Sequence, residues 1–261
     1  MAASPTAPST SPAAIGGRPS SDALPRRPLA LVTGASMGIG EEIARVLAER
    51  GHDVVLTARS EDRLHTLASE LEVLGATTHV LPLDLASEGA VDRLVAWLGE
   101  QGLEIDVLVN NASSAPLGNF ETISAETFET IVNTNIRSVF YLTQAVWRTM
   151  LQQGRGVIVN ISSLAAIDPF PGFSLYGSSK AWLDILTHVL AAEGEAADIR
   201  VYSIRPGAVE TPMLRGLFPD FPAEQCVQPE EVAQMIWRCI NEPDELATGT
   251  PHHVTNQPDH S

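Results

Sequence analysis

Short apolar runs alternate along this chain with longer segments in which apolar residues recur at helical spacing. Leu64, Leu67, Leu71 and Leu74, for example, are three or four residues apart, which is typical of a helix with one buried face. The runs that predict strands are 29–33, 54–57, 80–83, 107–109, 157–161 and 201–204, and residues near 251–254 are compatible with a last edge strand. The predicted helices follow the turn after residue 33 and then cover 64–74, 91–98, about 125–152, 176 to about 192, and a segment opened by Pro229.

Apolar strands that alternate with helices predict a parallel sheet covered by helices on both faces. We therefore expect an α/β protein with a single doubly wound sheet over residues 28–254. Residues 1–27 are rich in Ala, Ser, Pro, Thr and Gly and have almost no large apolar side chain, so they predict a disordered tail. Residues 255–261 are expected to fray.

The composition narrows the classes of protein. The chain has 32 acidic and 16 basic residues and a net charge of −16, whereas a protein that binds duplex nucleic acid normally has a basic face. No apolar run approaches the roughly 20 residues of a membrane helix, so we expect no membrane contact. The two cysteines do not suffice for a disulfide scaffold, which favours free thiols in the cytoplasm. No spacing typical of metal ligands is present, so no metal is expected.

Three glycines, Gly34, Gly38 and Gly40, follow the first predicted strand, with Ser36 and Ile39 between them. Glycine lets the backbone turn sharply and approach a pyrophosphate, and the following helix directs its positive N-terminus at the same anion. The alternative is a tight strand–helix turn with no ligand. The position after the first strand favours a dinucleotide site.

Arg59 follows the second predicted strand, and no carboxylate precedes it there. In NAD-selective sites an acidic residue near this point holds the ribose 2′-hydroxyl, whereas an arginine suits a 2′-phosphate. Ser36 offers a hydroxyl to the same phosphate. These residues predict NADP(H) rather than NAD(H), and the alternative is that Arg59 is a solvated loop charge.

Tyr176 and Lys180 are four residues apart, which places them on one face of a helix. Lys180 is the only lysine in the chain. A phenol alone has a pKa of about 10, and a cation ~4 Å away at an effective dielectric near 20 is worth about 4 kcal/mol, or roughly three pKa units. The pair therefore predicts a phenol that acts as a general acid–base group, and the alternative is a chance match of the spacing.

Together these motifs resemble the short-chain dehydrogenase/reductase family over about residues 28–213, and the resemblance implies a Rossmann-type fold. It implies catalytic roles for Asn135, Ser163, Tyr176 and Lys180. The cofactor-binding residues that it implies are Gly34, Ser36, Gly38, Ile39, Gly40, Arg59, Asp84, Leu85, Asn111, Tyr176, Lys180, Pro206, Gly207 and Thr211. The chain departs from the family pattern at Ser113, where the family has a glycine.

The resemblance implies an oxidoreductase that transfers a hydride between NADP(H) and a carbonyl or secondary alcohol, similar to a 3-oxoacyl reductase or a general ketone or aldehyde reductase. Tyr176 would donate the proton, Ser163 would hydrogen-bond the substrate oxygen, and Lys180 would hold the nicotinamide ribose. Asn135 would position a water that returns protons to Lys180. The alternative is a regulatory protein that senses NADP(H) on the same fold.

The C-terminal part departs from the ketoacyl reductases of this family, which usually end in a strand and a V-D-G-G-like turn. Residues 249–255 differ, which weakens an assignment to fatty-acid synthesis and one of the two usual dimer contacts. A homodimer or homotetramer is still expected. The sequence leaves open whether the substrate is a ketoacyl thioester, a ketone or a polyol. It also leaves open whether residues 213–224 shape the pocket or only pack.

Overall fold

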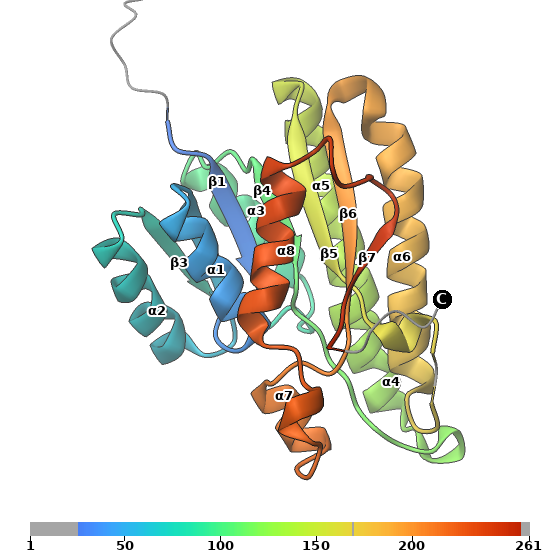
Figure 1. Ribbon diagram of the computed structural model, residues 1–261. Coiled ribbons are helices and arrows are strands. Elements are labelled where there is room, and N and C mark those ends of the chain that lie inside the picture. The colour runs from blue at the N-terminus through green and yellow to red at the C-terminus, as the bar shows by residue number, and fades with distance from the viewer. Residues whose placement is uncertain (1–25, 169, 257–261) are drawn as a thin grey trace, which may run out of the picture.

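A seven-stranded parallel sheet in the order β3-β2-β1-β4-β5-β6-β7 forms the centre of the molecule in this computed structural model (Figure 1). The structure describes residues 26–168 and 170–256. The strands are β1 (Leu29–Thr33), β2 (Asp53–Ala58), β3 (Thr78–Pro82), β4 (Val107–Asn110), β5 (Gly156–Ile161), β6 (Ile199–Pro206) and β7 (Pro251–Val254). The predicted α/β fold with a single doubly wound parallel sheet is confirmed, including its edge strand near the C-terminus.

Helices cover both faces of the sheet. They are α1 (Ile39–Glu49), α2 (Glu61–Val73), α3 (Ala90–Glu100), α4 (Ala125–Ile131), α5 (Ser138–Gln153), α6 (Ser174–Gly194), α7 (Pro212–Leu217) and α8 (Pro229–Asn241). The helix expected over about 125–152 is interrupted, because the six residues Val132–Arg137 form a wider π-helical turn between α4 and α5. Such turns frequently occur at functional sites.

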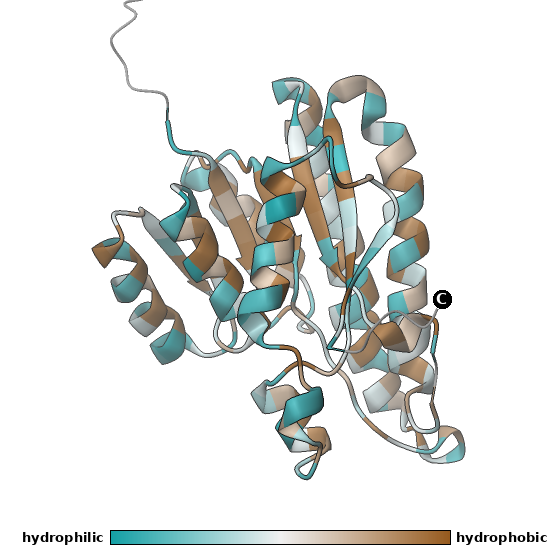
Figure 2. Cartoon of the chain, in the orientation of Figure 1, coloured by the Kyte–Doolittle hydropathy of each residue, from teal (hydrophilic) through white to brown (hydrophobic). Residues whose placement is uncertain are grey.

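Alternation along the strands explains the two hydrophobic cores. Val54 and Leu56 of β2 lie in the core shared with α1, α2 and α8, whereas Val55 faces the core shared with α3 and α5. Figure 2 shows this pattern as hydrophobic strands between helices whose polar residues face outward. Burial on both faces is the reason why the central strands are almost continuously apolar in sequence.

Two arginines fasten the start of the described chain to the sheet. Arg26 donates to the Asp106 carboxylate at 2.6 Å, and Arg27 donates to the carbonyl oxygen of Gly51 at 3.0 Å. Residues 1–25 of the predicted tail and residues 257–261 of the predicted frayed end lie outside the described residues. Asn256, at the other end, donates to the carbonyl oxygen of Cys226.

The strand order reverses between β1 and β4, which lie side by side although the chain passes through β2 and β3 between them. In sheets of this kind, ligands bind in the crevice at the carboxyl ends of the strands at such a reversal. Helix α7 lies beyond these ends, below the arrowheads in Figure 1. Among the described helices, none has the length and hydropathy to cross a membrane.

Candidate active site

A cavity of about 1220 Å³ opens at the carboxyl ends of the strands. It exceeds the ~300–1,000 Å³ of an ordinary small-molecule pocket, so it has room for a dinucleotide and a second molecule. The predicted site residues that line it are Gly34, Ser36, Gly38, Ile39, Arg59, Asp84, Leu85, Asn111, Ser163, Tyr176, Lys180, Pro206, Gly207 and Thr211. Gly40 and Asn135 are the two predicted site residues outside this lining.

The turn between β1 and α1 has the shape that a pyrophosphate site needs. Gly34 has a φ of 68°, and a Cβ there would lie 2.9 Å from the Cα of Ala112. A Cβ on Gly40 would overlap the carbonyl oxygen of Gly34, so this glycine serves close packing of the helix on the turn rather than the cavity wall. Asn111 fastens the turn, since its Nδ2 donates to the carbonyl oxygens of Thr33 at 2.9 Å and Gly34 at 3.2 Å. These residues fit a bound dinucleotide.

The wall at the carboxyl ends of β2 and β3 is formed by Arg59, Asp84 and Leu85. Arg59 is exposed and follows β2 directly. The Asp84 carboxylate caps the loop after β3, because it accepts from the backbone N–H of Ala86 at 3.0 Å. The guanidinium of Arg59 is therefore the cation that this wall offers to a phosphate.

Helix α6 places Tyr176 and Lys180 one turn apart on the same wall. The Nζ of Lys180 donates to the carbonyl oxygen of Ile161 at 2.7 Å and lies 5.5 Å from the centre of the Tyr176 ring. Ser163 comes from the loop after β5, where its Oγ accepts from the backbone N–H of Ala165 at 3.2 Å and where it also hydrogen-bonds Tyr176. The structure thus brings the three predicted side chains together.

The structure corrects the expectation for Tyr176: its pKa is raised, whereas a nearby cation was expected to lower it. Burial raises the pKa of Tyr176, and the hydrogen bond with Ser163 opposes this effect. Burial lowers the pKa of Lys180 to about 8. The nearby Asp184 carboxylate raises the pKa of Lys180, but its effect is smaller than that of burial. The phenol is therefore held in its protonated form, and lysine loses its proton more readily than usual.

Asp184, on the same helix as Lys180, is expected from the sequence to be a solvated charge rather than a catalytic group, and the structure corrects this expectation of solvation. It is buried on α6, where it accepts from Ser203 Oγ at 2.5 Å and from Arg205 Nε at 2.8 Å. These partners lie on β6, so the ion pair joins α6 to the sheet behind Lys180. Its spacing of four residues from Lys180 was the available signal.

Asn135 lies in the π-helical turn, behind the cavity wall. Its Oδ1 accepts from the backbone N–H of Ser114 at 2.8 Å, and its Nδ2 donates to the carbonyl oxygen of Ser114 at 2.9 Å and to Ser179 Oγ at 3.0 Å. The side chain therefore joins the segment after β4 to α6. Ser114 and Ser179 were not predicted, because no local motif points to them.

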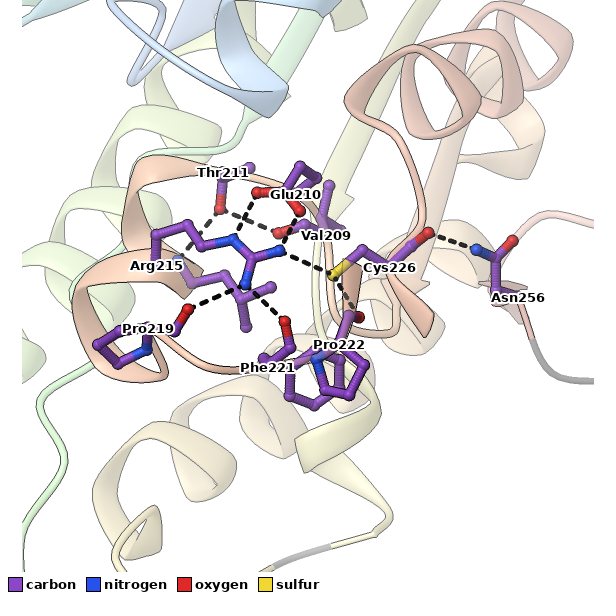
Figure 3. A network of polar contacts seen from close by, with 10 residues as sticks. Val209, Glu210, Thr211, Arg215, Pro219, Phe221, Pro222, Cys226 and Asn256 are labelled. Carbon is purple, nitrogen blue, oxygen red and sulfur yellow. Dashed lines mark hydrogen bonds and ion pairs between the residues drawn. The ribbon is translucent and has the colours of Figure 1, made fainter. Parts of the chain in front are cut away.

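The segment after β6 forms a lid that Arg215 holds together (Figure 3). Arg215 forms an ion pair with Glu210, with its Nε 2.7 Å from Oε1, and also donates to the carbonyl oxygen of Pro219 at 3.2 Å and to that of Phe221 at 2.6 Å. Thr211 begins α7, since its Oγ1 accepts from the N–H of Leu214 at 3.2 Å. The lid therefore shapes the pocket and does not only pack against the rest of the protein. Its residues in the cavity lining are Met213, Leu214, Leu217, Phe218 and Phe221.

Ser113, at the position where the family has glycine, also lines the cavity. Its Oγ is buried and has no hydrogen-bond partner among the described residues. The neighbouring residues Asn111, Ala112 and Ser114 do form hydrogen bonds. The N–H of Ala112, for example, donates to Thr33 Oγ1 at 3.0 Å.

In the described ranges, no group of three or more His, Cys, Asp or Glu residues is arranged to hold a metal ion.

A Rossmann-type sheet, a glycine-rich turn and a paired tyrosine and lysine define the class of nucleotide-dependent oxidoreductases. The family model for short chain dehydrogenases matches residues 28–221. The chain belongs to the short-chain dehydrogenase family and is an oxidoreductase of that family.

Relatives and solved structures agree with this membership. NADP-dependent 3-hydroxy acid dehydrogenase YdfG of Escherichia coli (strain K12) is 34% identical over 80% of this chain and 87% of the relative. A variant of actinorhodin polyketide ketoreductase with NADPH is 33% identical, with a TM-score of 0.81, over 88% of this chain and 96% of that chain. A short-chain dehydrogenase from Sphingobium yanoikuyae in complex with NADPH is 33% identical, with a TM-score of 0.76, over 82% and 85% of the two chains.

Proposed function

We propose that this chain is an NADP(H)-dependent reductase or dehydrogenase that interconverts a carbonyl compound and a secondary alcohol. One observation carries the proposal: Ser163, Tyr176 and Lys180 line the same cavity as the glycine-rich turn and Arg59. A proton donor thus shares one space with a site for a dinucleotide. The NADP dependence of YdfG and the NADPH in two similar structures support the choice of cofactor.

Different residues would contact different parts of the cofactor. The turn with Gly34 and Gly38, followed by α1, suits the pyrophosphate, and Arg59 suits the 2′-phosphate. Asp84 and Leu85 would contact the adenine, while Thr211 and the residues Pro206 and Gly207 would contact the nicotinamide end. When bound, the reduced nicotinamide supplies a hydride for the carbonyl carbon.

Side chains of the protein would carry out the proton transfer. Tyr176 donates its phenolic proton to the carbonyl oxygen, and its raised pKa keeps it protonated at neutral pH. Ser163, which hydrogen-bonds Tyr176, is placed to donate to the same oxygen and to stabilise its developing charge. Lys180, with a pKa of about 8, is suited to hold a ribose hydroxyl and to pass a proton toward Tyr176. Asn135 positions this wall through its bonds to Ser114 and Ser179.

A Tyr176→Phe variant tests the proposal. The substitution removes only the phenolic hydroxyl, so the fold and the dissociation constant for NADPH should stay nearly unchanged while carbonyl reduction is lost. Binding is measured by fluorescence titration and turnover by the loss of NADPH absorbance with a panel of ketones and aldehydes. A protein that only senses NADP(H) would bind the nucleotide with no turnover in the wild type. Substantial turnover by the variant would show that another group donates the proton.

We also propose that the chain forms a homodimer or homotetramer. Phe140 and Tyr141 on α5 and Ile185 and Val189 on α6 are large apolar side chains that are exposed in the single chain. Phe140 and Tyr141 contact each other, and Ile185 and Val189 lie one turn apart on α6, so each helix presents an exposed apolar patch of the kind that forms contact surfaces. A cytoplasmic location is part of the proposal as well, and it is supported by two buried cysteines that are free thiols, Cys226 and Cys239.

A further inference from the structure

An aromatic group lies next to the proposed proton donor. The ring of Phe173 is 5.1 Å from the ring of Tyr176, 4.6 Å from that of Phe170 and 6.0 Å from that of Phe218. Phe170 and Phe173 come from the loop between β5 and α6, whereas Phe218 comes from the lid. All four rings line the cavity, so a carbonyl placed at Tyr176 has aromatic edges and faces around its substituent.

Among the described residues that line the cavity, the basic side chains are those of Arg59, Lys180 and His253. Lys180 is one helical turn from Tyr176, with its Nζ 5.5 Å from the centre of that ring, and His253 on β7 lies 3.5 Å from Arg205. Arg215 is on the lid, but its guanidinium is occupied by Glu210 and by carbonyl oxygens at the far end of the lid (Figure 3). The group formed by Phe170, Phe173 and Phe218 therefore contains no arginine or lysine side chain, and Lys180, the cation beside Tyr176, already donates to the carbonyl oxygen of Ile161.

The mouth of the cavity next to these rings is apolar with one acidic group. Ile167, Phe170 and Met213 line the cavity and are also 53%, 43% and 44% exposed, so they form part of its accessible rim. Asp168 lies between the first two along the chain, lines the cavity and is exposed. A negative substituent on a substrate would meet this carboxylate and a protein of net charge −16.

We infer that the substrate is an uncharged carbonyl compound with an aryl or similarly bulky apolar substituent, rather than a 3-oxo acid, an acyl group on an acidic carrier protein or a polyol. The inference rests on the proposed function. Burying an unpaired carboxylate among aromatic rings is costly, and a polyol would leave many hydroxyl groups without partners there. The substituent packs between the rings of Phe170, Phe173 and Phe218 while the carbonyl oxygen meets Ser163 and Tyr176.

The reaction balances without a further reactant. The hydride supplied by NADPH forms the new C–H bond, the phenolic proton of Tyr176 forms the O–H bond, and the C=O double bond becomes single. The products are a secondary alcohol and NADP⁺, and a proton from solvent restores Tyr176 through Lys180. The carbonyl compound is reduced by two electrons, and the nucleotide is oxidised by two.

A matched pair of ketones tests the charge preference. Methyl 4-acetylbenzoate and 4-acetylbenzoate share the reacting carbonyl and the ring, and they differ in the group opposite the ketone, which is a neutral methyl ester in one and a negatively charged carboxylate in the other. The wild type should reduce the neutral ester with a kcat/KM at least about tenfold higher, because the carboxylate on the ring lies among Phe170, Phe173 and Phe218, which offer no cation to pair it. Equal values, or a preference for the carboxylate, would overturn the inference and leave the proposed function standing. No turnover of any carbonyl compound by NADPH-bound protein would instead overturn the proposed function.

Variants at Phe218 test the aromatic contact. Phe218→Ala should lower the kcat/KM for methyl 4-acetylbenzoate about tenfold more than that for methyl acetoacetate, which has no ring. Phe128→Ala is the matched control, because Phe128 is exposed on α4 and lies outside the cavity lining. A loss that is equal for both substrates would overturn the assignment of the ring contact.

A third variant reverses the charge environment. Phe218→Arg places a cation among the rings, so the preference for the neutral ester over 4-acetylbenzoate should fall by about tenfold or more. Asp168→Asn should shift the same ratio in the same direction by a smaller factor, since the group is exposed and screened. Asp220→Asn, an exposed lid carboxylate outside the lining, is its control. An unchanged ratio in Phe218→Arg, with the NADPH dissociation constant preserved, would contradict the inference.

Discussion

The single lysine allows the electrostatics of the site to be measured by chemical labelling. Burial lowers the pKa of Lys180 to about 8 from its ordinary value of 10.5. Only the neutral amine attacks an acylating reagent. About a tenth of the amines are neutral at a pH near 7 when the pKa is near 8, but only about 0.03% when it is near 10.5. Lys180 should therefore carry roughly 300-fold more neutral amine than an ordinary lysine at the same pH.

The assay follows acetylation of the peptide that contains Lys180 by mass spectrometry as the pH is raised. Labelling by a small reagent such as acetic anhydride should increase up to a pH of about 8 and then level off, because the amine is fully neutral above its pKa. Arg155→Lys supplies an internal reference, since Arg155 is 66% exposed and a lysine there should keep increasing in reactivity well above that pH. NADPH should protect Lys180 and leave the reference lysine reactive.

Activity measured on the same samples connects labelling to function. Acetylation removes the positive charge and adds bulk in the cavity, so residual turnover should fall in proportion to the labelled fraction of Lys180. Lys180→Arg retains a positive charge but has a wider, planar head group, so it should recover little activity. A labelling midpoint above a pH of about 10, or full labelling with turnover intact, would refute both the depressed pKa and the role given to Lys180.

Three further outcomes are expected. Arg59→Ala should weaken NADPH binding roughly ten- to a hundredfold and NADH binding much less, as measured by titration calorimetry, because a charged bond to the 2′-phosphate is worth about 1.5–3 kcal/mol; equal losses would contradict the role. Arg215→Met should raise KM for the ketone more than the dissociation constant for NADPH, because the lid loses its bonds to Glu210 and Phe221, whereas Arg238→Met, which removes an ion pair on α8, should change neither. Ile185→Asp should shift sedimentation velocity toward the monomer, and an unchanged assembly would place the contact elsewhere.

The cofactor half of the site was predictable because local sequence builds it. Gly34 and Gly38 need positive φ values within one turn, and Arg59 follows a strand that its apolar run already marks. Tyr176 and Lys180 are on one helix at a spacing that fixes their common face. Each of these features depends on residues close in sequence, so motif and periodicity together predicted where they would lie.

The polar residues that position this half of the site could not be predicted from local sequence in the same way. The amide of Asn135 is placed by a π-helical turn, and a regular helical period over 125–152 gives no sign of that extra residue in the turn. Its partners Ser114 and Ser179 lie 21 and 44 residues away. The direction of the Tyr176 pKa depends on burial, which the hydrogen bond with Ser163 opposes, and burial follows only from the packed structure.

The substrate half depends still more on contacts between distant segments. Phe218 meets Phe173 only because β6, which leads to the lid, pairs with β5, which leads to the loop before α6. The sequence shows both aromatic segments, but it leaves open whether they meet over the same cavity or pack separately. Glu210 and Arg215 then fix the lid that carries Phe218 by a contact across five residues that no helical period requires. The proposed aromatic contacts with the substrate therefore depend on strand order and on the conformation of the lid, neither of which a local sequence motif encodes.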